Sequence, residues 1–458
     1  MLPKKTSLAI ATFGAIVLLL ELAKVAHPFQ PEVVFDFHPR QVATAPEPTP
    51  VIKPPVVVAK GSKTAKPKPQ LSEVTPNLID HDNLRAFYQA LWRTESKQPG
   101  AVTRILHYGD SPVTADSITA DVRSLMQDHF GDAGHGFILV AKPWAWYGHR
   151  GVEVGGKNWK IEAASQSHAH DGFHGLGGVS FQGSTGASSH WVLKENHAAM
   201  EVEFLIQPDG GEFTVRAGGQ VIGQVNTAGA KQPAFQTFPL PEGARQIDLT
   251  VDGGSVHMFG VSFVRNQPGV IYNSLGLNGA QVQAVVRFFE KNQWAEQLQH
   301  QRPDLVVINY GTNESIYADY VERSYPGELH EVIRRVKAAV PNASVLIMSP
   351  MDRAEKNRSG EIATPPTLSK LVDIQRRTAE EMGCAFFNTF QAMGGEGTMV
   401  RWYNNQPRLV SADYIHPLPA GAHKVGVLLY DALEAGFEQF KSTHQLRAES
   451  ARTAEGQP

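Results

Sequence analysis

A serine, a histidine and an aspartate stand where they could catalyse acyl transfer. Ser111 follows an apolar run in the turn Gly109-Asp-Ser111, and His416 follows Asp413 by three residues. A serine hydroxyl is a weak nucleophile until a base takes its proton, and histidine can do so at neutral pH. A carboxylate bonded to the other ring nitrogen would fix the tautomer and orientation of that histidine. These residue types predict attack on an ester by Ser111, with His416 as base and Asp413 as its orienting partner.

Two further positions could stabilise the oxyanion that this attack creates. Gly279 ends the turn Gly276-Leu-Asn-Gly279, and Asn313 lies in Gly311-Thr-Asn-Glu314 after an apolar run. We expect three donors, the backbone amides of Ser111 and Gly279 and the side-chain amide of Asn313, each worth about 3 kcal/mol. Glycine at 279 would let the backbone approach the substrate closely. Gly276 competes with Gly279 for this role.

Each motif also has a purely structural interpretation. Gly-Asp-Ser is a good helix N-cap and turn sequence. Asp-x-x-His is often a loop hydrogen bond, and the two glycine-bearing motifs could be plain turns. Their order along the chain favours the catalytic interpretation, because the carboxyl ends of parallel strands share one rim of a sheet, where ligands bind.

The elements that would carry these residues alternate between strands and helices. Buried strands are predicted at about residues 102–106, 344–349 and 385–388, and two more within 269–279 and 303–314, each ending in the turn or polar residues at the end of that stretch. Helices are predicted at about residues 82–96, 117–129, 280–290, 325–340, 368–382 and 421–437. This alternation implies right-handed crossovers and a parallel, doubly wound α/β sheet.

A stretch without helical periodicity interrupts this pattern. Between about residues 148 and 265, short runs alternate polar with apolar residues and are separated by Gly and Pro turns. Such spacing predicts an antiparallel β-sandwich. We therefore expect the α/β body to occupy residues 77–147 and 266–442, with an inserted β domain at 148–265 and a disordered tail at 443–458.

The amino terminus has the layout of an export signal. Lys4 and Lys5 precede an apolar run over residues 8–20, and no convincing cleavage site follows. Residues 1–27 are therefore predicted to be a signal peptide or, better, an uncleaved anchor, and the proline-dense residues 28–76 a semi-rigid spacer. We expect an exported protein of the periplasm or cell envelope, tethered to the inner membrane by this segment alone.

Composition restricts the other function classes. The 458 residues carry a formal net charge of -3, so nothing suggests a nucleic-acid partner. The single cysteine, Cys384, excludes an internal disulfide. The chemistry above needs no cofactor and no metal, and the loose group His168, His170 and His174 is predicted to be a surface loop. We expect a monomer.

The four motifs resemble, in order, the signature blocks of the SGNH (GDSL-type) esterase superfamily. The blocks are Gly109-Asp-Ser111, Gly276-Leu-Asn-Gly279, Gly311-Thr-Asn-Glu314 and Asp413-Tyr-Ile-His416. The resemblance implies a flavodoxin-like three-layer α/β/α fold. It also implies Ser111 as nucleophile, Gly279 and Asn313 as oxyanion donors, His416 as general base and Asp413 as the residue that orients it. Pro112 stands where this family usually has Leu.

The order of the domains is similar to that of bacterial peptidoglycan O-acetylesterases, which carry an inserted carbohydrate-binding-module-like domain. The loop Phe130-Gly-Asp-Ala-Gly-His-Gly136 adds to this resemblance. It implies removal of O-acetyl groups from a cell-envelope glycan through an acetyl-enzyme. An O-acetyltransferase with the same triad and an inert glycan-binding protein are alternatives. Four further residues are placed where they could contact substrate: Asp110, His107, His135 and Arg353.

Overall fold

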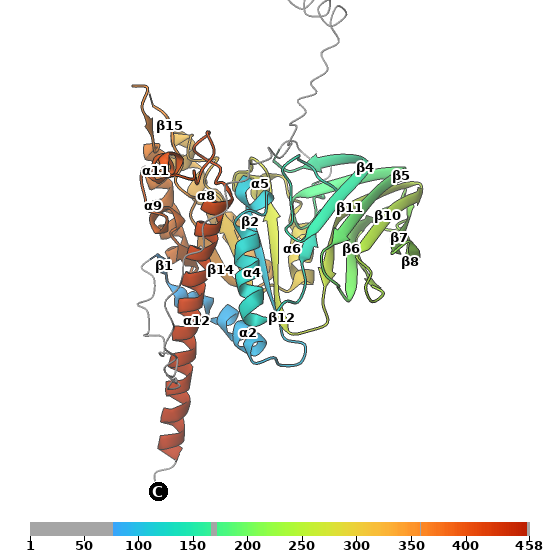
Figure 1. Ribbon diagram of the computed structural model, residues 1–458, viewed down its shortest axis with the longest axis horizontal. Coiled ribbons are helices and arrows are strands. Elements are labelled where there is room, and N and C mark those ends of the chain that lie inside the picture. Colours follow the sequence, from blue (N-terminus) through green and yellow to red (C-terminus); the bar gives the residue numbers. More distant parts are fainter. Residues whose placement is uncertain (1–76, 166–171, 358, 456–458) are drawn as a thin grey trace, which may run out of the picture. The chain divides into compact units, whose positions relative to one another are not determined.

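The computed structural model describes residues 77–165, 172–357 and 359–455 (Figure 1). The predicted anchor and spacer, residues 1–76, lie outside the described residues, as do His168 and His170. Among the helices of the described part, none is long and apolar enough to cross a membrane.

A six-stranded sheet forms the centre of the α/β part, in the order β1-β17-β14-β13-β2-β12. Its strands are β1 (Leu78–Ile79), β2 (Val102–Gly109), β12 (Gly269–Gly276), β13 (Leu305–Asn309), β14 (Ser344–Met348) and β17 (Ala385–Phe387). All neighbours pair in parallel except β1, which runs antiparallel to β17. Gly109 pairs with both Gly276 and Asn309, so β2, β12 and β13 end level with one another. The motifs that follow these strands therefore share one rim.

Helices cover both faces of this sheet, because alternate strand residues point to opposite sides. Ile105 and Val307 face a core formed with α2 (Arg85–Glu95), α4 (Thr119–Phe130) and α12 (Pro419–Glu455). Figure 1 shows these three helices over one face of the sheet. Leu106 and Val306 face the other core, formed with α6 (Lys291–Gln301), α8 (Tyr325–Ala339) and α9 (Pro366–Glu381). The three-layer α/β/α fold is confirmed.

Shorter elements complete this part of the chain. They are η1 (His81–Leu84), α3 (Ser111–Thr114), α5 (Gln283–Arg287), α7 (Ala318–Arg323), α10 (Thr389–Ala392), α11 (Thr398–Asn404), β15 (Glu355–Lys356) and β16 (Ile362–Ala363).

Two predictions of helix limits are wrong. The helix expected at 280–290 is shorter than predicted, since α5 covers only Gln283–Arg287. The next helix, α6, starts after Glu290, whose side chain caps it by accepting a hydrogen bond from the Gln293 amide at 2.7 Å. The tail expected at 443–458 is helical as far as Glu455, since α12 continues through it. That stretch has no glycine or proline before Gly456 and contains several good helix formers, including Ala, Gln, Leu, Arg and Glu.

A second, antiparallel sheet of nine strands lies between β2 and β12 in the sequence. Its strands are β3 (Gly136–Ile138), β4 (Val152–Ala163), β5 (Val179–Leu193), β6 (Ala199–Ile206), β7 (Glu212–Ala217), β8 (Gln220–Asn226), β9 (Gln232–Pro239), β10 (Gln246–Gly253) and β11 (Ser255–Val264). Long β5 joins two halves: residues 188–192 pair with β10, and residues 181–184 pair with β11. Phe204 of β6 meets Phe213 of β7 with ring centroids 5.4 Å apart, so side chains of the two halves pack against each other. The β insertion follows the sequence expectation, while its exact limits stay a prediction.

The two sheets contact each other through buried polar groups. Asn273 of β12 accepts a hydrogen bond from the Phe137 amide at 2.8 Å and donates one to the Ile105 carbonyl at 3.0 Å. Gln301 of α6 donates to the buried carboxyl of Glu203 at 2.8 Å. The antiparallel sheet is thus attached to strand β12, which pairs with β2, and to helix α6.

Candidate active site

Ser111, His416 and Asp413 form a continuous hydrogen-bonded relay. The distance from Ser111 Oγ to His416 Nε2 is 2.8 Å, and His416 Nδ1 lies 2.6 Å from Asp413 Oδ2. When Nδ1–H donates its hydrogen bond to Asp413, Nε2 is unprotonated and can accept the serine proton. His416 and Asp413 are both about half exposed, at 47% and 45% of their side chains. The relay therefore stands at the surface, where a large ester can reach it.

The Asp413 carboxylate is held ionised by its surroundings. Partial burial would raise its pKa, but hydrogen bonds from the Ser411 hydroxyl, the His416 ring and two backbone amides hold the pKa well below its usual range. Oδ1 accepts the amides of Ile415 and His416 at 2.9 and 3.0 Å. An ionised and fixed carboxylate is what is needed to orient the histidine and to stabilise its protonated form.

The segment from Gly109 to Thr114, which carries Ser111 and is called the nucleophile turn below, lies close to the neighbouring strands because of two glycines. Ser111 is the first residue of α3, directly beyond the end of β2. A side chain at Gly109 would place its Cβ 2.5 Å from Val113 Cγ2. A side chain at Gly276 would place its Cβ 1.9 Å from the Thr114 backbone nitrogen. Gly276 is therefore required for packing against α3.

Gly279 has a different reason to be glycine. It is exposed, its φ is +67°, and a Cβ there would meet nothing within 4 Å. This left-handed conformation turns the chain at the rim, beyond the end of β12. The geometry thus separates the two candidates of the second motif: Gly276 serves packing, and Gly279 shapes the exposed turn.

The third motif holds this turn by hydrogen bonds. Asn313 Nδ2 donates to the Ala280 carbonyl at 2.8 Å, and Gln281 Nε2 donates to the Asn313 carbonyl at 3.1 Å. Glu314 Oε1 accepts the Val282 amide at 2.7 Å. A side-chain amide carries two protons, so Asn313 can hold Ala280 with one and offer the other to an oxyanion. The arrangement fixes Asn313 and the Gly279 turn relative to each other.

Two buried acids lie behind these groups. Burial raises the pKa of Asp110 to about 6, although a Thr312 hydrogen bond and the charge of His416 oppose the shift. Burial also raises the pKa of Glu314 to about 8, against the effect of the Val282 amide. Glu314 is therefore largely protonated at neutral pH, which limits negative charge beside a site where an oxyanion must form.

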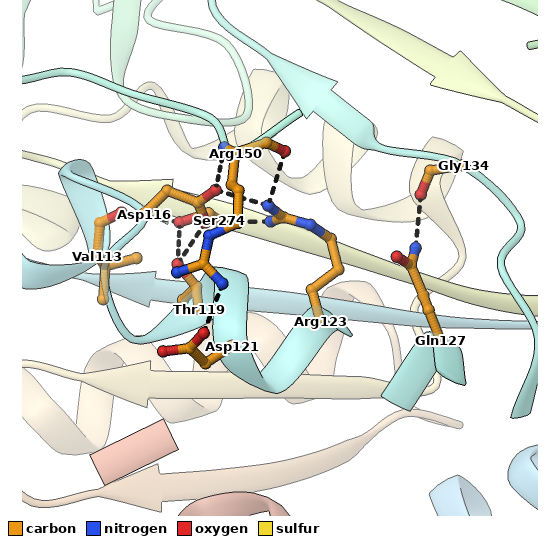
Figure 2. A network of polar contacts seen from close by, with 9 residues as sticks. All are labelled: Val113, Asp116, Thr119, Asp121, Arg123, Gln127, Gly134, Arg150 and Ser274. Atoms are coloured by element: carbon orange, nitrogen blue, oxygen red, sulfur yellow. Dashed lines mark hydrogen bonds and ion pairs between the residues drawn. The ribbon is translucent and has the colours of Figure 1, made fainter. Parts of the chain in front are cut away.

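A buried polar network anchors the nucleophile turn to the rest of the protein (Figure 2). Ser274 Oγ of β12 donates to the Val113 carbonyl at 2.8 Å and lies 2.8 Å from Thr119 Oγ1. Thr119 in turn donates to Asp116 Oδ1 at 2.7 Å. Asp116 also accepts Arg123 Nη2 at 2.6 Å and the Arg150 amide at 2.8 Å. One carboxylate thereby joins the nucleophile turn, helix α4 and the loop that leads into β4.

The structure does not place the four predicted substrate contacts together at the relay. His107 was predicted as a residue that could line the pocket and bind substrate, but it is fully buried, with Nδ1 2.7 Å from the Tyr272 hydroxyl. Asp110 is also buried, at 3% exposure. Arg353 is 8% exposed and donates to the Thr312 carbonyl at 3.2 Å, so it supports the third motif from behind. These residues can position the site but offer little surface to a substrate.

His135 belongs to another cavity. Its ring lies 4.9 Å from that of His197 and 5.2 Å from that of His149. The cavity is lined mainly by charged residues, among them Arg123 and Arg265, and by none of the relay residues. His174, expected in a surface loop, is fully buried. The sequence around His174 gave no indication of this burial.

Sequence reasoning missed two residues of the site's surroundings. Asp116 was not singled out, because its burial and its φ of +52° are properties of the folded chain and leave no signal in the sequence. Trp146 was also overlooked; its indole Nε1 donates to Asn278 Oδ1 at 3.2 Å, next to Gly279. Its signal was the aromatic cluster Trp144-Ala-Trp-Tyr147 at the start of the insertion.

The fold and the relay together define an enzyme class that uses a serine to cleave carboxylic esters. Residues 242–424 match the model of the GDSL-like lipase/acylhydrolase family. Over these residues the chain is similar to this family, and together with the relay the match supports a carboxylic ester hydrolase. The matched stretch begins inside the antiparallel sheet, and the first motif lies before it because the insertion separates that motif from the others.

The comparison with solved structures supports the fold of the whole described body. A peptidoglycan O-acetylesterase superposes with a TM-score of 0.68 at 22% identity, over 80% of this chain and 99% of its own. A Bacillus subtilis protein, 15% identical over 61% of this chain and 90% of its own, has a TM-score of 0.32. A family two carbohydrate esterase of Clostridium thermocellum, 12% identical over 61% of this chain and 100% of its own, has a TM-score of 0.27. Among curated proteins none matches significantly.

Proposed function

We propose that this protein removes O-acetyl groups from a cell-envelope polysaccharide, with peptidoglycan as the foremost candidate, through an acetyl-enzyme on Ser111. The observation that carries the proposal is the uninterrupted relay from Ser111 Oγ to His416 and on to Asp413. The similarity in fold to a peptidoglycan O-acetylesterase supports the choice of substrate.

In the first half of the reaction, Ser111 Oγ attacks the acetyl carbonyl carbon while His416 Nε2 takes the hydroxyl proton. Asp413 stabilises the imidazolium that forms. The oxyanion is stabilised by the amides of Ser111 and Gly279 and by the second proton of Asn313 Nδ2. The tetrahedral intermediate then breaks its bond to the sugar oxygen, which leaves as a hydroxyl with the proton from His416.

In the second half, water attacks the acetyl-enzyme. His416 takes a proton from the water, the same donors stabilise the second oxyanion, and acetate leaves as Ser111 regains its proton. A sugar hydroxyl entering in place of water would make the protein an acetyltransferase. The half-exposed relay gives water ready access, which favours hydrolysis.

The amino-terminal sequence indicates a cellular location for this activity. A signal anchor at residues 1–27 and a proline-rich spacer at 28–76 would hold the enzyme near the inner membrane on the side of the cell wall. We propose that it acts there as a monomer on O-acetylated glycan.

Ser111→Ala and His416→Ala test the proposal. Each is expected to lower hydrolysis of an aryl acetate, and acetate release from O-acetylated peptidoglycan, by about four to six orders of magnitude. Ser442→Ala is the matched control, because Ser442 lies on α12, is half-buried and donates its hydroxyl proton to the Glu438 carbonyl. Circular dichroism checks that each variant is folded.

The same experiments can overturn the proposal. Turnover that survives Ser111→Ala would remove Ser111 as nucleophile. Acetylated oligosaccharide in place of free acetate would identify a transferase. Glycan binding without reaction toward a serine-directed phosphonate would identify an inert binder. Faster acetate release from other acetylated polysaccharides would move the substrate away from peptidoglycan.

A further inference from the structure

Exposed apolar side chains gather beside the candidate oxyanion groups. In the described part of the chain the exposed large hydrophobic residues are Trp92, Trp146, Ile161, Val192, Val221, Ile316 and Tyr317. Of these, Trp146 contacts Asn278, the neighbour of Gly279, and Ile316 and Tyr317 follow Asn313 by three and four residues. Exposed aromatic groups next to a reaction centre are more often functional than scattered ones.

Trp146 is exposed but held in place. Its side chain is 55% exposed, while Trp144 and Tyr147 on either side are 8% and 7% exposed and anchor the loop. The Tyr147 hydroxyl accepts the Leu139 amide at 2.8 Å, and the Tyr147 amide donates to the Trp144 carbonyl at 3.0 Å. The bond from the indole to Asn278 fixes the ring further. Little side-chain entropy is left to lose when a ligand stacks on it.

Tyr317 lines a groove beside Asn313, the second candidate oxyanion donor. It is 52% exposed, and its amide donates to the Glu314 carbonyl at 2.9 Å, which fixes its backbone. The groove is lined by Gln281, Gln283, Tyr317, Ala318, Asp319 and Tyr320. Gln281 also bonds the Asn313 carbonyl, so the groove starts directly beside the oxyanion group.

We propose that Trp146 and Tyr317 are stacking platforms for two sugar rings of the substrate, one beside Gly279 and one beside Asn313. This proposal rests on the proposed function and specifies its substrate as an oligomeric glycan. Pyranose rings present apolar C–H faces to an aromatic ring and hydroxyl edges to amides and carboxylates. The groove offers both kinds of partner. A long acyl chain would leave Gln281, Gln283 and Asp319 without hydrogen bonds to the ligand, so a sugar fits this lining better.

The test compares p-nitrophenyl acetate with O-acetylated chitooligosaccharides of increasing length. In the wild type, kcat/KM is expected to rise from the monosaccharide to the trisaccharide. Trp146→Ala and Tyr317→Ala should each lower the ratio of kcat/KM for the trisaccharide to that for the aryl acetate by about tenfold, mostly through KM. Trp146→Phe, which keeps a ring but loses the N–H, should restore most of the ratio.

Trp92→Ala is the matched control, because Trp92 is also exposed, at 38%, but packs on α12 against Phe440 and His444. It should leave the ratio unchanged. An unchanged ratio in Trp146→Ala would overturn the platform. An equal loss of kcat/KM on both substrates in Trp146→Ala and Asn278→Ala would also overturn it. That result would mean that the indole only supports the Gly279 turn.

Two further outcomes separate this inference from the proposed function. If the variants lose activity on aryl octanoate rather than on sugars, the surface binds acyl chains and the inference is overturned. If the wild type releases no acetate from any glycan, the proposed function fails. Binding of unacetylated chitotriose to Ser111→Ala, measured by calorimetry, then still decides the inference: adding Trp146→Ala should weaken the affinity about tenfold, and an unchanged affinity would overturn the inference.

Discussion

Asp116 and Arg123 form a buried ion pair directly behind the nucleophile turn. Arg123 Nη2 lies 2.6 Å from Asp116 Oδ2, and the two side chains are only 3% and 2% exposed. Burial alone would raise the pKa of Asp116. Arg123, His149 and the hydroxyl of Thr119 instead hold this pKa well below its usual range. Through Thr119 and Ser274 the pair supports Val113, two residues after the nucleophile (Figure 2).

Asp116→Asn is expected to destabilise the protein and to slow catalysis. The variant leaves Arg123 buried without its counter-ion, which typically costs about 3–5 kcal/mol. Asparagine tolerates the left-handed backbone of this position, so the loss reports the charge rather than strain. Urea unfolding and kcat on an aryl acetate measure the two effects.

Asp128→Asn, which replaces an exposed aspartate of α4, is the control for Asp116→Asn. If Asp116→Asn unfolds at the same urea concentration as Asp128→Asn, the pair contributes no stability. If it is destabilised but keeps full kcat, the network supports the fold without positioning Ser111.

Glu314→Gln should make the protein more stable at alkaline pH. Burial raises the pKa of Glu314 from 4.5 to about 8. The folded state therefore binds this proton more tightly than the unfolded state. Its stabilising effect is complete below pH 4.5 and is lost as pH rises through about 8. Glutamine stays neutral and keeps an acceptor for the Val282 amide. The stability of the wild type should fall relative to Glu314→Gln by up to about 1.4 kcal/mol per pH unit within that window.

Urea melts of both proteins between pH 4.5 and 9 measure this difference. Parallel stability curves would show that Glu314 ionises in the folded protein as readily as in the unfolded one. Asp319→Asn, an exposed acid five residues further on, should leave the pH dependence unchanged.

The fold was predictable because the apolar runs of a parallel sheet are continuous and its crossover helices are amphipathic. The four motifs were predictable for a related reason: each directly follows such a run or precedes a helix, so topology alone brings them to one rim. The Asp413/His416 pair needed only local spacing. The fold, the four motifs and the Asp413/His416 pair thus all depend on residues close together in the sequence rather than on contacts between distant segments.

What could not be predicted depends on contacts between distant segments. In a strand buried on both faces, periodicity does not distinguish a core position from a rim position, so His107 looked available while Tyr272 covers it. The partners of Asp116 come from residues 119, 123 and 150, and Trp146 meets Asn278 across 132 residues of sequence. The separate reasons for glycine at 276 and 279 likewise required the packing of α3.

Gly276→Ala should be far more damaging than Gly279→Ala. The new Cβ at 276 would lie 1.9 Å from the Thr114 nitrogen, so α3 and with it Ser111 must move. At 279 the Cβ meets nothing within 4 Å, and only the left-handed backbone, with φ of +67°, is strained, at a cost of about 1 kcal/mol. Activity of Gly276→Ala on an aryl acetate is expected to fall at least a hundredfold, with a much smaller loss for Gly279→Ala. Equal losses would mean that the two glycines share one role.

The buried histidines predict a loss of stability on acidification. Burial, together with Arg123, lowers the pKa of His149 to about 3. Burial and the neighbouring histidines and arginines lower that of His135 to about 2. The unfolded chain binds these protons near pH 6.5 and the folded chain does not. The stability they contribute is therefore complete above pH 6.5 and is lost as pH falls toward 3. His149→Gln should flatten the stability curve between pH 6.5 and 4, measured by urea unfolding. His330→Gln, which replaces an exposed histidine of α8, should not. A curve of unchanged steepness in His149→Gln would assign the acid sensitivity to other groups.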